Sequence, residues 1–251
     1  MSEESKTILV TGGTRGIGRA VCLAAAKQGH DVAFSYASDD AAAESLIDLC
    51  ESQGVGALAI RSDVGDPDQV AAMFRAVDLR FGRIDGLVNN AGITGMQGQF
   101  LDTPREVIAD VFRVNVSGMM DCCREAAMRM ALSRGGRGGA IVNISSGAAR
   151  TGAPNAYVWY GAAKAAVESF TTGFAQEVAG DGIRVNCVSP GVTATEIHSR
   201  SGRTASLEQL AATIPLKRVA EPEEIADPIL YLLSDGASYV VGATLRVGGG
   251  R

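Results

Sequence analysis

The sequence predicts an α/β protein in which a doubly wound parallel sheet of about seven strands forms one domain over residues 1–251. Short β-branched runs alternate with longer helical patterns, which is typical of parallel strands joined by right-handed crossovers. Ile8-Leu9-Val10 and Ile141-Val142 are apolar on successive residues, as in strands that helices cover on both faces. No internal repeat or long linker marks a domain boundary.

Each element of this sheet follows from its local pattern. β-branched and apolar runs predict strands at 7–11, 31–36, 57–62, 86–89, 140–144, 183–189 and 244–247. Apolar residues at helical spacing predict helices at roughly 16–28, 40–53, 66–80, 103–132, 157–179 and 223–234. The ligand site of such a sheet lies outside the carboxyl ends of its strands, so functional residues are sought directly after each strand.

The composition excludes several classes of protein. Hydrophobic residues make up 46% of the 251 residues and charged residues 20%, which excludes a disordered chain. The net charge of -5 gives no basic field, so we expect neither nucleic acid nor a membrane as partner. Five cysteines without CxxC spacing and two distant histidines predict reduced core thiols and no metal site. The first residues lack a secretory or transit pattern, so we expect a cytoplasmic protein.

A glycine-rich turn separates the first strand from the first helix. It reads Thr11-Gly12-Gly13-Thr14-Arg15-Gly16-Ile17-Gly18, with glycines at Gly-x-x-x-Gly-x-Gly spacing. Glycine permits positive φ and close backbone approach, and the N–H groups of a helix N-terminus favour a pyrophosphate. Such a turn can be purely structural, but at the start of an alternating β/α chain it predicts a dinucleotide site. The expected contacts in the turn are Gly12, Thr14, Arg15, Gly16, Ile17 and Gly18.

The end of the second strand bears on the choice of dinucleotide. An NAD site of this type places an acid there for the ribose 2′-hydroxyl, but this strand runs Phe34-Ser35-Tyr36-Ala37-Ser38 without an acid before Asp39. Arg15 would meet a 2′-phosphate, which suits its planar donors. We therefore expect NADP, with NAD possible. The alternative is that Arg15 is a solvated loop residue and Asp39 or Asp40 caps the next helix.

Four polar residues are candidates for catalysis. Tyr160 and Lys164 lie four residues apart, on one face of the expected helix. An adjacent Lys cation favours a phenolate and lowers a Tyr pKa. Ser146 follows the strand at 140–144, at the edge expected to carry the site. Asn115 stands in a mostly apolar helical run, a pattern more typical of a buried amide satisfied by backbone groups.

These motifs resemble the short-chain dehydrogenase/reductase family over nearly the whole chain, in family order and at family spacing. They are Thr11-Gly12-x-x-x-Gly16-x-Gly18, Asp63-Val64, Asn89-Asn90-Ala91-Gly92, Asn115, Ser146, Tyr160-x-x-x-Lys164 and Pro190-Gly191. The resemblance implies a Rossmann-type fold and an oxidoreductase that moves a hydride between a nicotinamide and a carbonyl or alcohol carbon.

The resemblance also implies a role for each member of a tetrad. Tyr160 would act as general acid/base on the substrate oxygen, and Ser146 would hydrogen-bond the same oxygen. Lys164 would lower the Tyr160 pKa and hold the nicotinamide ribose, and Asn115 would anchor a water in a proton relay. The further cofactor contacts it implies are Asp63, Val64, Asn90, Ala91, Gly92, Tyr160, Lys164, Gly191, Thr193 and Thr195.

Substrate choice in this family comes largely from the segment after the sixth strand, here near 193–215. This segment contains Glu196, His198, Arg200 and Arg203, which would either meet a polar or anionic substrate or form an ordinary solvated surface. Trp159, just before Tyr160, would line the pocket or serve in packing.

Two subgroups of the family look similar to this sequence, the 3-oxoacyl-carrier-protein reductases and the sugar dehydrogenases similar to glucose 1-dehydrogenase. Arg134 and Arg137 would suit an acidic carrier protein at the mouth of the site, whereas Asp181 stands where a second basic contact is expected. The spacing between Ser146 and Tyr160 favours the sugar or polyol branch. We therefore expect a small carbonyl or alcohol substrate, polar or polyol-like, with the carrier-protein reductase as the alternative.

The family usually forms homotetramers or homodimers, which pair the helices at 103–132 and 157–179. Ala162, Ala163, Ala165 and Ala166 would permit such close packing, or would pack within their own subunit. A nicotinamide-binding regulatory protein without useful turnover is the alternative from another functional class.

Overall fold

A computed structural model describes residues 5–196 and 207–251. In this part of the chain, seven strands form one parallel sheet in the order β3-β2-β1-β4-β5-β6-β7. The strands are β1 (Thr7–Val10), β2 (Asp31–Tyr36), β3 (Ala57–Arg61), β4 (Gly86–Asn89), β5 (Gly139–Ile144), β6 (Ile183–Pro190) and β7 (Thr244–Val247). The order reverses between β1 and β4, so their carboxyl ends form the switch point where a ligand binds in such sheets. The expected doubly wound parallel sheet is confirmed.

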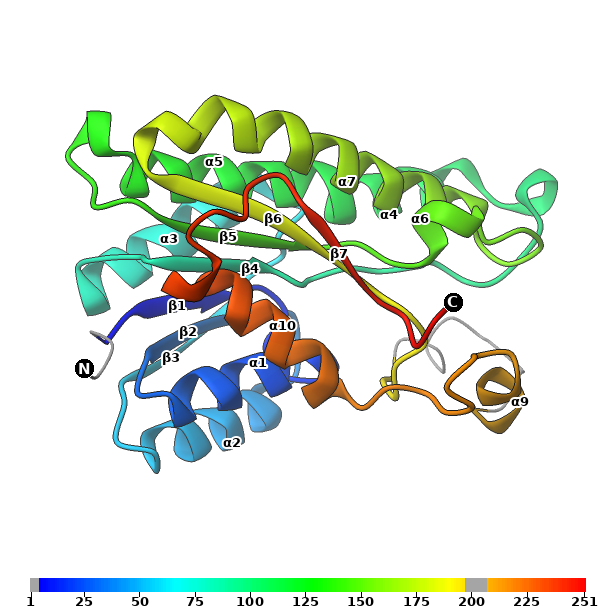
Figure 1. The fold of residues 1–251 in the computed structure, drawn as a ribbon, viewed down its shortest axis with the longest axis horizontal. Coiled ribbons are helices and arrows are strands. Elements are labelled where there is room, and N and C mark those ends of the chain that lie inside the picture. Colours follow the sequence, from blue (N-terminus) through cyan, green and yellow to red (C-terminus); the bar gives the residue numbers. More distant parts are fainter. Residues whose placement is uncertain (1–4, 197–206) are drawn as a thin grey trace.

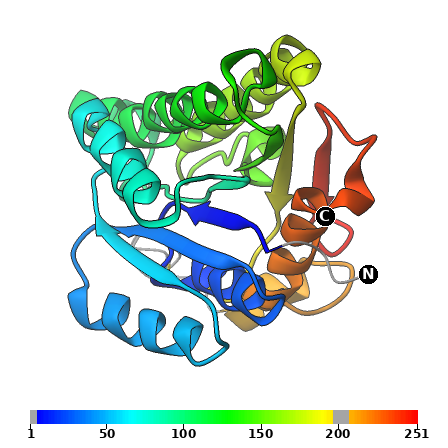
Figure 2. The ribbon, with the colours of Figure 1, turned by 90° about the vertical axis from the view of Figure 1, so that its left-hand side faces the viewer.

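Helices cover both faces of the sheet (Figures 1 and 2). The α-helices are α1 (Gly16–Lys27), α2 (Asp40–Glu51), α3 (Pro67–Phe81), α4 (Arg105–Phe112), α5 (Met119–Met130), α6 (Ala148–Thr151), α7 (Val158–Val178), α9 (Leu207–Ala212) and α10 (Pro222–Leu233). Helices α1, α2 and α10 bury side chains such as Phe34 and Ile225 on one face. Helices α3, α5 and α7 bury Phe74, Leu87 and Ile141 on the other. Burial of apolar area on both faces stabilises the sheet.

Local capping explains where several helices begin and end. Asp39 precedes α2 and its side chain accepts the N–H of Ala42 at 3.0 Å. Asp66 caps α3 in the same way, and α3 ends at Gly82, whose φ of +71° suits glycine. The expectation that Asp39 caps the next helix is therefore confirmed.

The helix expected at 103–132 is not continuous. It consists of α4, a π-helical turn η2 (Arg113–Gly118) and α5. The amide Nδ2 of Asn115 donates to the carbonyl of Val111 at 2.8 Å. An unbroken α-helix would give that carbonyl to the backbone N–H of Asn115, so the side chain displaces a rung of the ladder. Periodicity alone does not reveal such an insertion, because the apolar pattern continues through it.

Other differences from the sequence-based elements are small. The strand bounds differ by at most one residue, and the short helices α6 and α9 were not expected. All five cysteines are buried and free, as expected. Within residues 5–196 and 207–251, no helix is both long and apolar enough to cross a bilayer.

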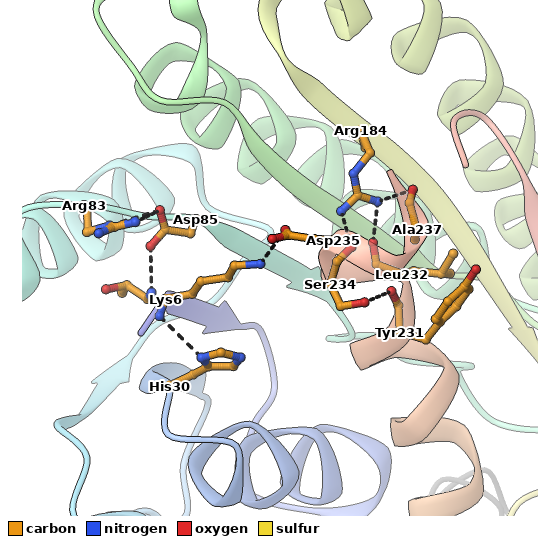
Figure 3. A network of polar contacts seen from close by, with 11 residues as sticks. Lys6, His30, Arg83, Asp85, Arg184, Tyr231, Leu232, Ser234, Asp235 and Ala237 are labelled. Carbon is orange, nitrogen blue, oxygen red and sulfur yellow. Dashed lines mark hydrogen bonds and ion pairs between the residues drawn. The ribbon is translucent and has the colours of Figure 1, made fainter. Parts of the chain in front are cut away.

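A network of polar contacts lies at the amino ends of the strands, opposite the switch point (Figure 3). The guanidinium of Arg184, at the start of β6, donates to the carbonyls of Leu232 and Ala237 through Nη1 and of Ser234 through Nη2, at 2.7, 3.1 and 3.0 Å. These carbonyls lie at and beyond the carboxyl end of α10, where helix carbonyls lack backbone partners. Arg184 therefore fastens α10 to the sheet.

We expect Arg184→Met to lower the free energy of unfolding by roughly 2–3 kcal/mol, because it leaves three carbonyls without their charged donor. The matched control is Lys6→Met, which breaks the 2.9 Å ion pair with Asp235, a carboxylate that is 81% exposed. That change should cost at most about 1 kcal/mol. Urea unfolding at a fixed protein concentration measures both, and equal losses would contradict the role given to Arg184.

Candidate active site

The glycine-rich turn between β1 and α1 has the geometry of a phosphate loop. Gly12 and Gly16 have φ of +69° and +50°, and a Cβ on Gly18 would lie 2.2 Å from the carbonyl oxygen of Gly12. Arg15 precedes α1 without a side-chain hydrogen bond to the helix, and the first turn of α1 contains no acidic residue. Neither Arg15 nor an acidic side chain of the first turn therefore occupies the free backbone N–H groups at the start of α1. The turn fits the pyrophosphate of a dinucleotide.

Reciprocal hydrogen bonds join the turn to the end of β4. The hydroxyl oxygen of Thr11 accepts the N–H groups of Asn90 and Ala91, each at 3.0 Å. The Asn90 amide donates in return to the carbonyls of Thr11 and Gly12, also at 3.0 Å. Asn90 and Ala91 thus lie beside the glycine turn, as the sequence predicts. The bracing role of Thr11 was missed, although its place at the end of β1 was the available signal.

Asn115 is buried and bonded to backbone groups. Its Oδ1 accepts the N–H of Ile93 at 3.2 Å, and its Nδ2 donates to the Ile93 carbonyl at 2.7 Å. A Cβ on Gly92 would lie 2.5 Å from Asn115 Oδ1 and 3.5 Å from Lys164 Nζ. The π-helical turn therefore carries Asn115 to the segment after β4 and next to Lys164. The expectation of a backbone-satisfied amide is confirmed, and the amide lies within the candidate site.

The remaining three candidates meet at the carboxyl end of β5. Tyr160 and Lys164 lie one turn apart on α7, with Lys164 Nζ 5.7 Å from the centroid of the Tyr160 ring. Lys164 Nζ donates to the carbonyl of Ile144, the last residue of β5, at 2.7 Å. Ser146 follows two residues later, and its hydroxyl is hydrogen-bonded with the Tyr160 phenol.

Two polar neighbours of these residues were not expected from the sequence. The hydroxyl of Ser145 lies 2.7 Å from Glu168 Oε1 and 3.2 Å from the Lys164 carbonyl oxygen, and its one hydrogen is shared between these two acceptors. Ser145 stands directly before Ser146, so these bonds fix the end of β5 against the turn of α7 that carries Lys164. Its position after a central strand was the available signal, but Ser is common in such loops.

Burial governs the charge of Tyr160 and Lys164. It raises the pKa of Tyr160 to about 12, the Tyr157 ring adds to the rise, and the hydrogen bond with Ser146 opposes it. It also lowers the pKa of Lys164 to about 8. The sequence-based expectation was that Lys164 lowers the Tyr160 pKa. The shift has the opposite sign, because removing both groups from water disfavours phenolate and ammonium alike.

The expected adenine-side residues lie after β3. Asp63 Oδ2 accepts from Arg113 Nη1 at 2.8 Å, and its other oxygen accepts the N–H of Gly65 at 2.9 Å. The Val64 side chain is buried in the core. Arg113 also pairs with Asp110. Asp63 is thus paired with Arg113 of the π-helical turn, while its side chain stays 45% exposed.

The expected nicotinamide-side residues follow β6. Gly191 is bonded to β7 through its N–H, and a Cβ on it would lie 2.7 Å from the Gly248 Cα. Thr193 is buried, and the Thr195 methyl group lies 3.0 Å from the position of a Cβ on Gly16. The segment after β6 therefore lies against the glycine turn. This places Thr195 beside the expected pyrophosphate position.

Two arginines bear on the choice of dinucleotide, Arg15 before α1 and Arg61 at the end of β3. Arg15 Nη1 lies 3.2 Å from Glu196 Oε2 in an exposed ion pair, and the Arg15 side chain is 33% exposed. Arg61 Nε donates to the carbonyl of Ala37, just beyond β2, at 3.2 Å. Sequence reasoning missed Arg61, which pairs with Tyr36 in the register of β2 and β3. Asp40, the acid nearest to this strand end after the cap residue, is hydrogen-bonded to the Tyr36 phenol.

Several other candidates lie away from this site. Arg134 and Arg137 are exposed in the turn before β5, at the amino ends of the strands, and Asp181 there accepts the N–H of Ser133 at 2.9 Å. Within one chain, the expectation that they flank the mouth of the site is wrong. Trp159 is 2% exposed and donates to the Thr94 carbonyl at 2.8 Å, which is a packing role.

Two further expectations concern three residues of the segment after β6 and the absence of a metal site. His198, Arg200 and Arg203 lie outside the described residues. Where side chains are described, no three His, Cys, Asp or Glu residues gather to hold a metal ion.

The Lys164 pKa predicts a pH-dependent stability. Between its folded value of about 8 and the ordinary value of 10.5 the unfolded chain binds more protons, so the free energy of unfolding rises with pH. We expect the free energy of unfolding of the native protein, relative to that of Lys164→Met, to rise over this interval by at most about 3 kcal/mol. Tyr160, with its raised pKa, acts in the opposite direction only above pH 10. Urea unfolding at several pH values measures the difference, and a constant value would mean that Lys164 keeps its ordinary pKa.

The sequence is similar to a known protein family and to several oxidoreductases of bacteria. A family model described as enoyl-(acyl carrier protein) reductase matches residues 12–251. The oxidoreductase YgfF of Escherichia coli (strain K12) is 46% identical, over 97% of this chain and 98% of that protein. L-rhamnose 1-dehydrogenase (NAD(P)(+)) of Sphingomonas sp. (strain SKA58) is 40% identical, over 98% and 96%. The 3-oxoacyl-[acyl-carrier-protein] reductase FabG of Staphylococcus aureus (strain N315) is 37% identical, over 98% of each chain.

Solved structures with the same fold include complexes with different dinucleotides. Acetoin dehydrogenase YohF from Salmonella typhimurium has a TM-score of 0.87 and 34% identity, covering 98% of this chain and 97% of that one. A blue fluorescent protein from a metagenomic library in complex with NADPH has a TM-score of 0.89 and 31% identity, covering 100% of this chain and 99% of that one. NAD+-bound xylitol dehydrogenase has a TM-score of 0.89 and 30% identity, covering 98% of each chain. With its fold, its glycine turn and these relatives, the chain belongs to the short-chain dehydrogenase/reductase family of NAD(P)-dependent oxidoreductases.

Proposed function

We propose that this protein is an NADP-dependent oxidoreductase that interconverts a carbonyl group and a secondary alcohol on a small polar or polyol-like substrate. The observation that carries the proposal is the convergence of Asn115, Ser146, Tyr160 and Lys164 at the carboxyl edge of the sheet, beside a glycine turn that fits a dinucleotide. The nicotinamide supplies or accepts the hydride when bound.

The residues of the chain provide the proton chemistry. Tyr160 is protonated at neutral pH, because its pKa lies at about 12, and it donates that proton to the carbonyl oxygen during reduction. Ser146, already hydrogen-bonded with the phenol, stabilises the charge that develops on the same oxygen. Lys164, with a pKa of about 8, can lose or regain a proton near neutral pH. In this proposal Asn115 holds the loop after β4 over Lys164, where a relay water would lie.

Three observations support NADP. No acid stands at the end of β2, and the first acid after it, Asp39, is used as the helix cap. Arg15 lies in the glycine turn, and Arg61 is fixed beside Ala37 at the end of β2. A 2′-phosphate needs positive charge at this place. The name of the relative L-rhamnose 1-dehydrogenase includes both NAD and NADP, so the proposal includes use of NAD as a second dinucleotide.

The substrate assignment rests on the relatives and on the placement of charge. L-rhamnose 1-dehydrogenase, acetoin dehydrogenase and xylitol dehydrogenase support a small hydroxylated or carbonyl substrate. The FabG relative supports the alternative, a 3-oxoacyl-carrier-protein reductase. Within one chain Arg134 and Arg137 lie at the opposite edge from Tyr160, which weakens that alternative. A redox-sensing regulator without turnover is the other alternative, and a working tetrad would exclude it.

We also propose that the enzyme is a cytoplasmic homotetramer or homodimer that pairs α7 with its copy in a neighbouring subunit. Ala162, Ala165 and Gly173 are exposed along one side of α7, whereas Ala163 is buried in its own subunit. Small exposed residues at helical spacing permit close approach of a second helix. The segment near 193–215 is proposed to set the choice of substrate.

We expect Tyr160→Phe to reduce turnover of a carbonyl substrate by roughly 10²–10⁴-fold, because the phenol supplies the proton. Binding of NADPH, followed by fluorescence titration, should change little. Tyr239→Phe is the matched control, since Tyr239 is 100% exposed and its loss of a hydroxyl should leave turnover unchanged. Full activity of the Tyr160→Phe variant would contradict the assigned role.

Replacing Arg15 by Ala tests the choice of dinucleotide. We expect the Kd for NADPH to rise by about ten- to a hundredfold, because a charge-assisted hydrogen bond to the 2′-phosphate is lost. The Kd for NADH should stay within about threefold. Arg75→Ala, which removes an exposed cation from α3, is the control for net charge. Equal losses for both dinucleotides would argue against Arg15 as the 2′-phosphate contact.

A further inference from the structure

Arg15 is held by a residue from a distant part of the chain. Its Nη1 lies 3.2 Å from Oε2 of Glu196, in the segment after β6. The neighbouring Thr195 packs its methyl group against Gly16. The cation expected to meet a 2′-phosphate therefore already faces a carboxylate, and that carboxylate belongs to the segment proposed to set the choice of substrate.

The contact is weak enough to be exchanged. It joins one guanidinium nitrogen to one carboxylate oxygen, and the two side chains are 33% and 64% exposed. Ion pairs of this exposure contribute little, because water and salt screen them. A phosphate can instead take two parallel hydrogen bonds from the planar guanidinium. A bound 2′-phosphate would thus draw Arg15 away from Glu196, at the cost of the existing pair.

We propose that Glu196 is a specificity-determining residue for the dinucleotide. It competes with the 2′-phosphate for Arg15 and so reduces the preference for NADP over NAD. The proposal rests on the NADP assignment, since it requires Arg15 to be the 2′-phosphate contact. NADH lacks the 2′-phosphate and leaves the pair between Arg15 and Glu196 intact, so only NADPH has to displace Glu196 from Arg15.

The test is a double-mutant cycle on the full-length protein, with Glu196→Gln, Arg15→Ala and the combined variant. The readout is the ratio of the Kd for NADH to the Kd for NADPH, measured by fluorescence titration at low salt. We expect Glu196→Gln to raise this ratio by about two- to fivefold, the range that an exposed ion pair allows. In the Arg15→Ala background, the same change should leave the ratio unaltered.

Glutamine keeps the shape of the Glu196 side chain, and the two side chains of the pair are 33% and 64% exposed, so the variants should fold. Glu51→Gln, at the end of α2, changes the net charge equally and should not move the ratio. If Arg15→Ala lowers the ratio but Glu196→Gln leaves it unchanged, the competition is wrong while the NADP assignment stands. If Arg15→Ala itself has no effect, both fail. If Glu196→Gln also raises the Kd ratio in the Arg15→Ala background, the proposal is overturned. The effect would then come from the loss of a negative charge and not from competition for Arg15.

Discussion

The hydrogen bond between the buried ammonium of Lys164 and the carbonyl of Ile144 is the contact on which the candidate site depends. It fixes α7 to the carboxyl end of β5 at 2.7 Å, and Ser145 repeats the connection one residue later. Tyr160 lies one helical turn before Lys164, and Ser146 lies two residues after Ile144. A single junction between a helix and a strand therefore sets the mutual positions of three of the four candidate catalytic residues.

Burial gives this junction its chemical character. A lysine removed from water has a lowered pKa, and a tyrosine removed from water has a raised one. At neutral pH the phenol is therefore protonated and ready to donate, while Lys164 is still mostly an ammonium that loses its proton more readily than an exposed lysine. The cost of burying an ammonium is offset by the close carbonyl dipole of Ile144. Asn115 Oδ1 and Lys164 Nζ both approach Gly92. The π-helical turn is what permits this approach.

The sheet and the glycine turn could be predicted because each has a local signal, whereas the tetrad was expected from the resemblance to the family. β-α alternation, glycine spacing and a Tyr and a Lys one turn apart are visible in the sequence. The interruption around Asn115 could not be predicted, because it depends on which carbonyl the amide reaches. The sign of the Tyr160 pKa shift depends on burial, and the partners of Arg15 and Arg61 depend on tertiary contacts between residues far apart in sequence. Such quantities have no signature in spacing or composition.

Arginines at the two ends of the strands have opposite roles. At the amino ends, Arg184 makes three hydrogen bonds to carbonyls of its own chain, so its donors are committed to the fold. At the carboxyl ends, Arg15 makes one long contact with an exposed carboxylate, and no acid of the first turn occupies the N–H groups of α1. Donors that are saturated by the protein stabilise it, whereas donors held weakly can be transferred to a ligand at little cost. This difference, more than residue identity, separates the structural arginine from the one that can recognise a phosphate.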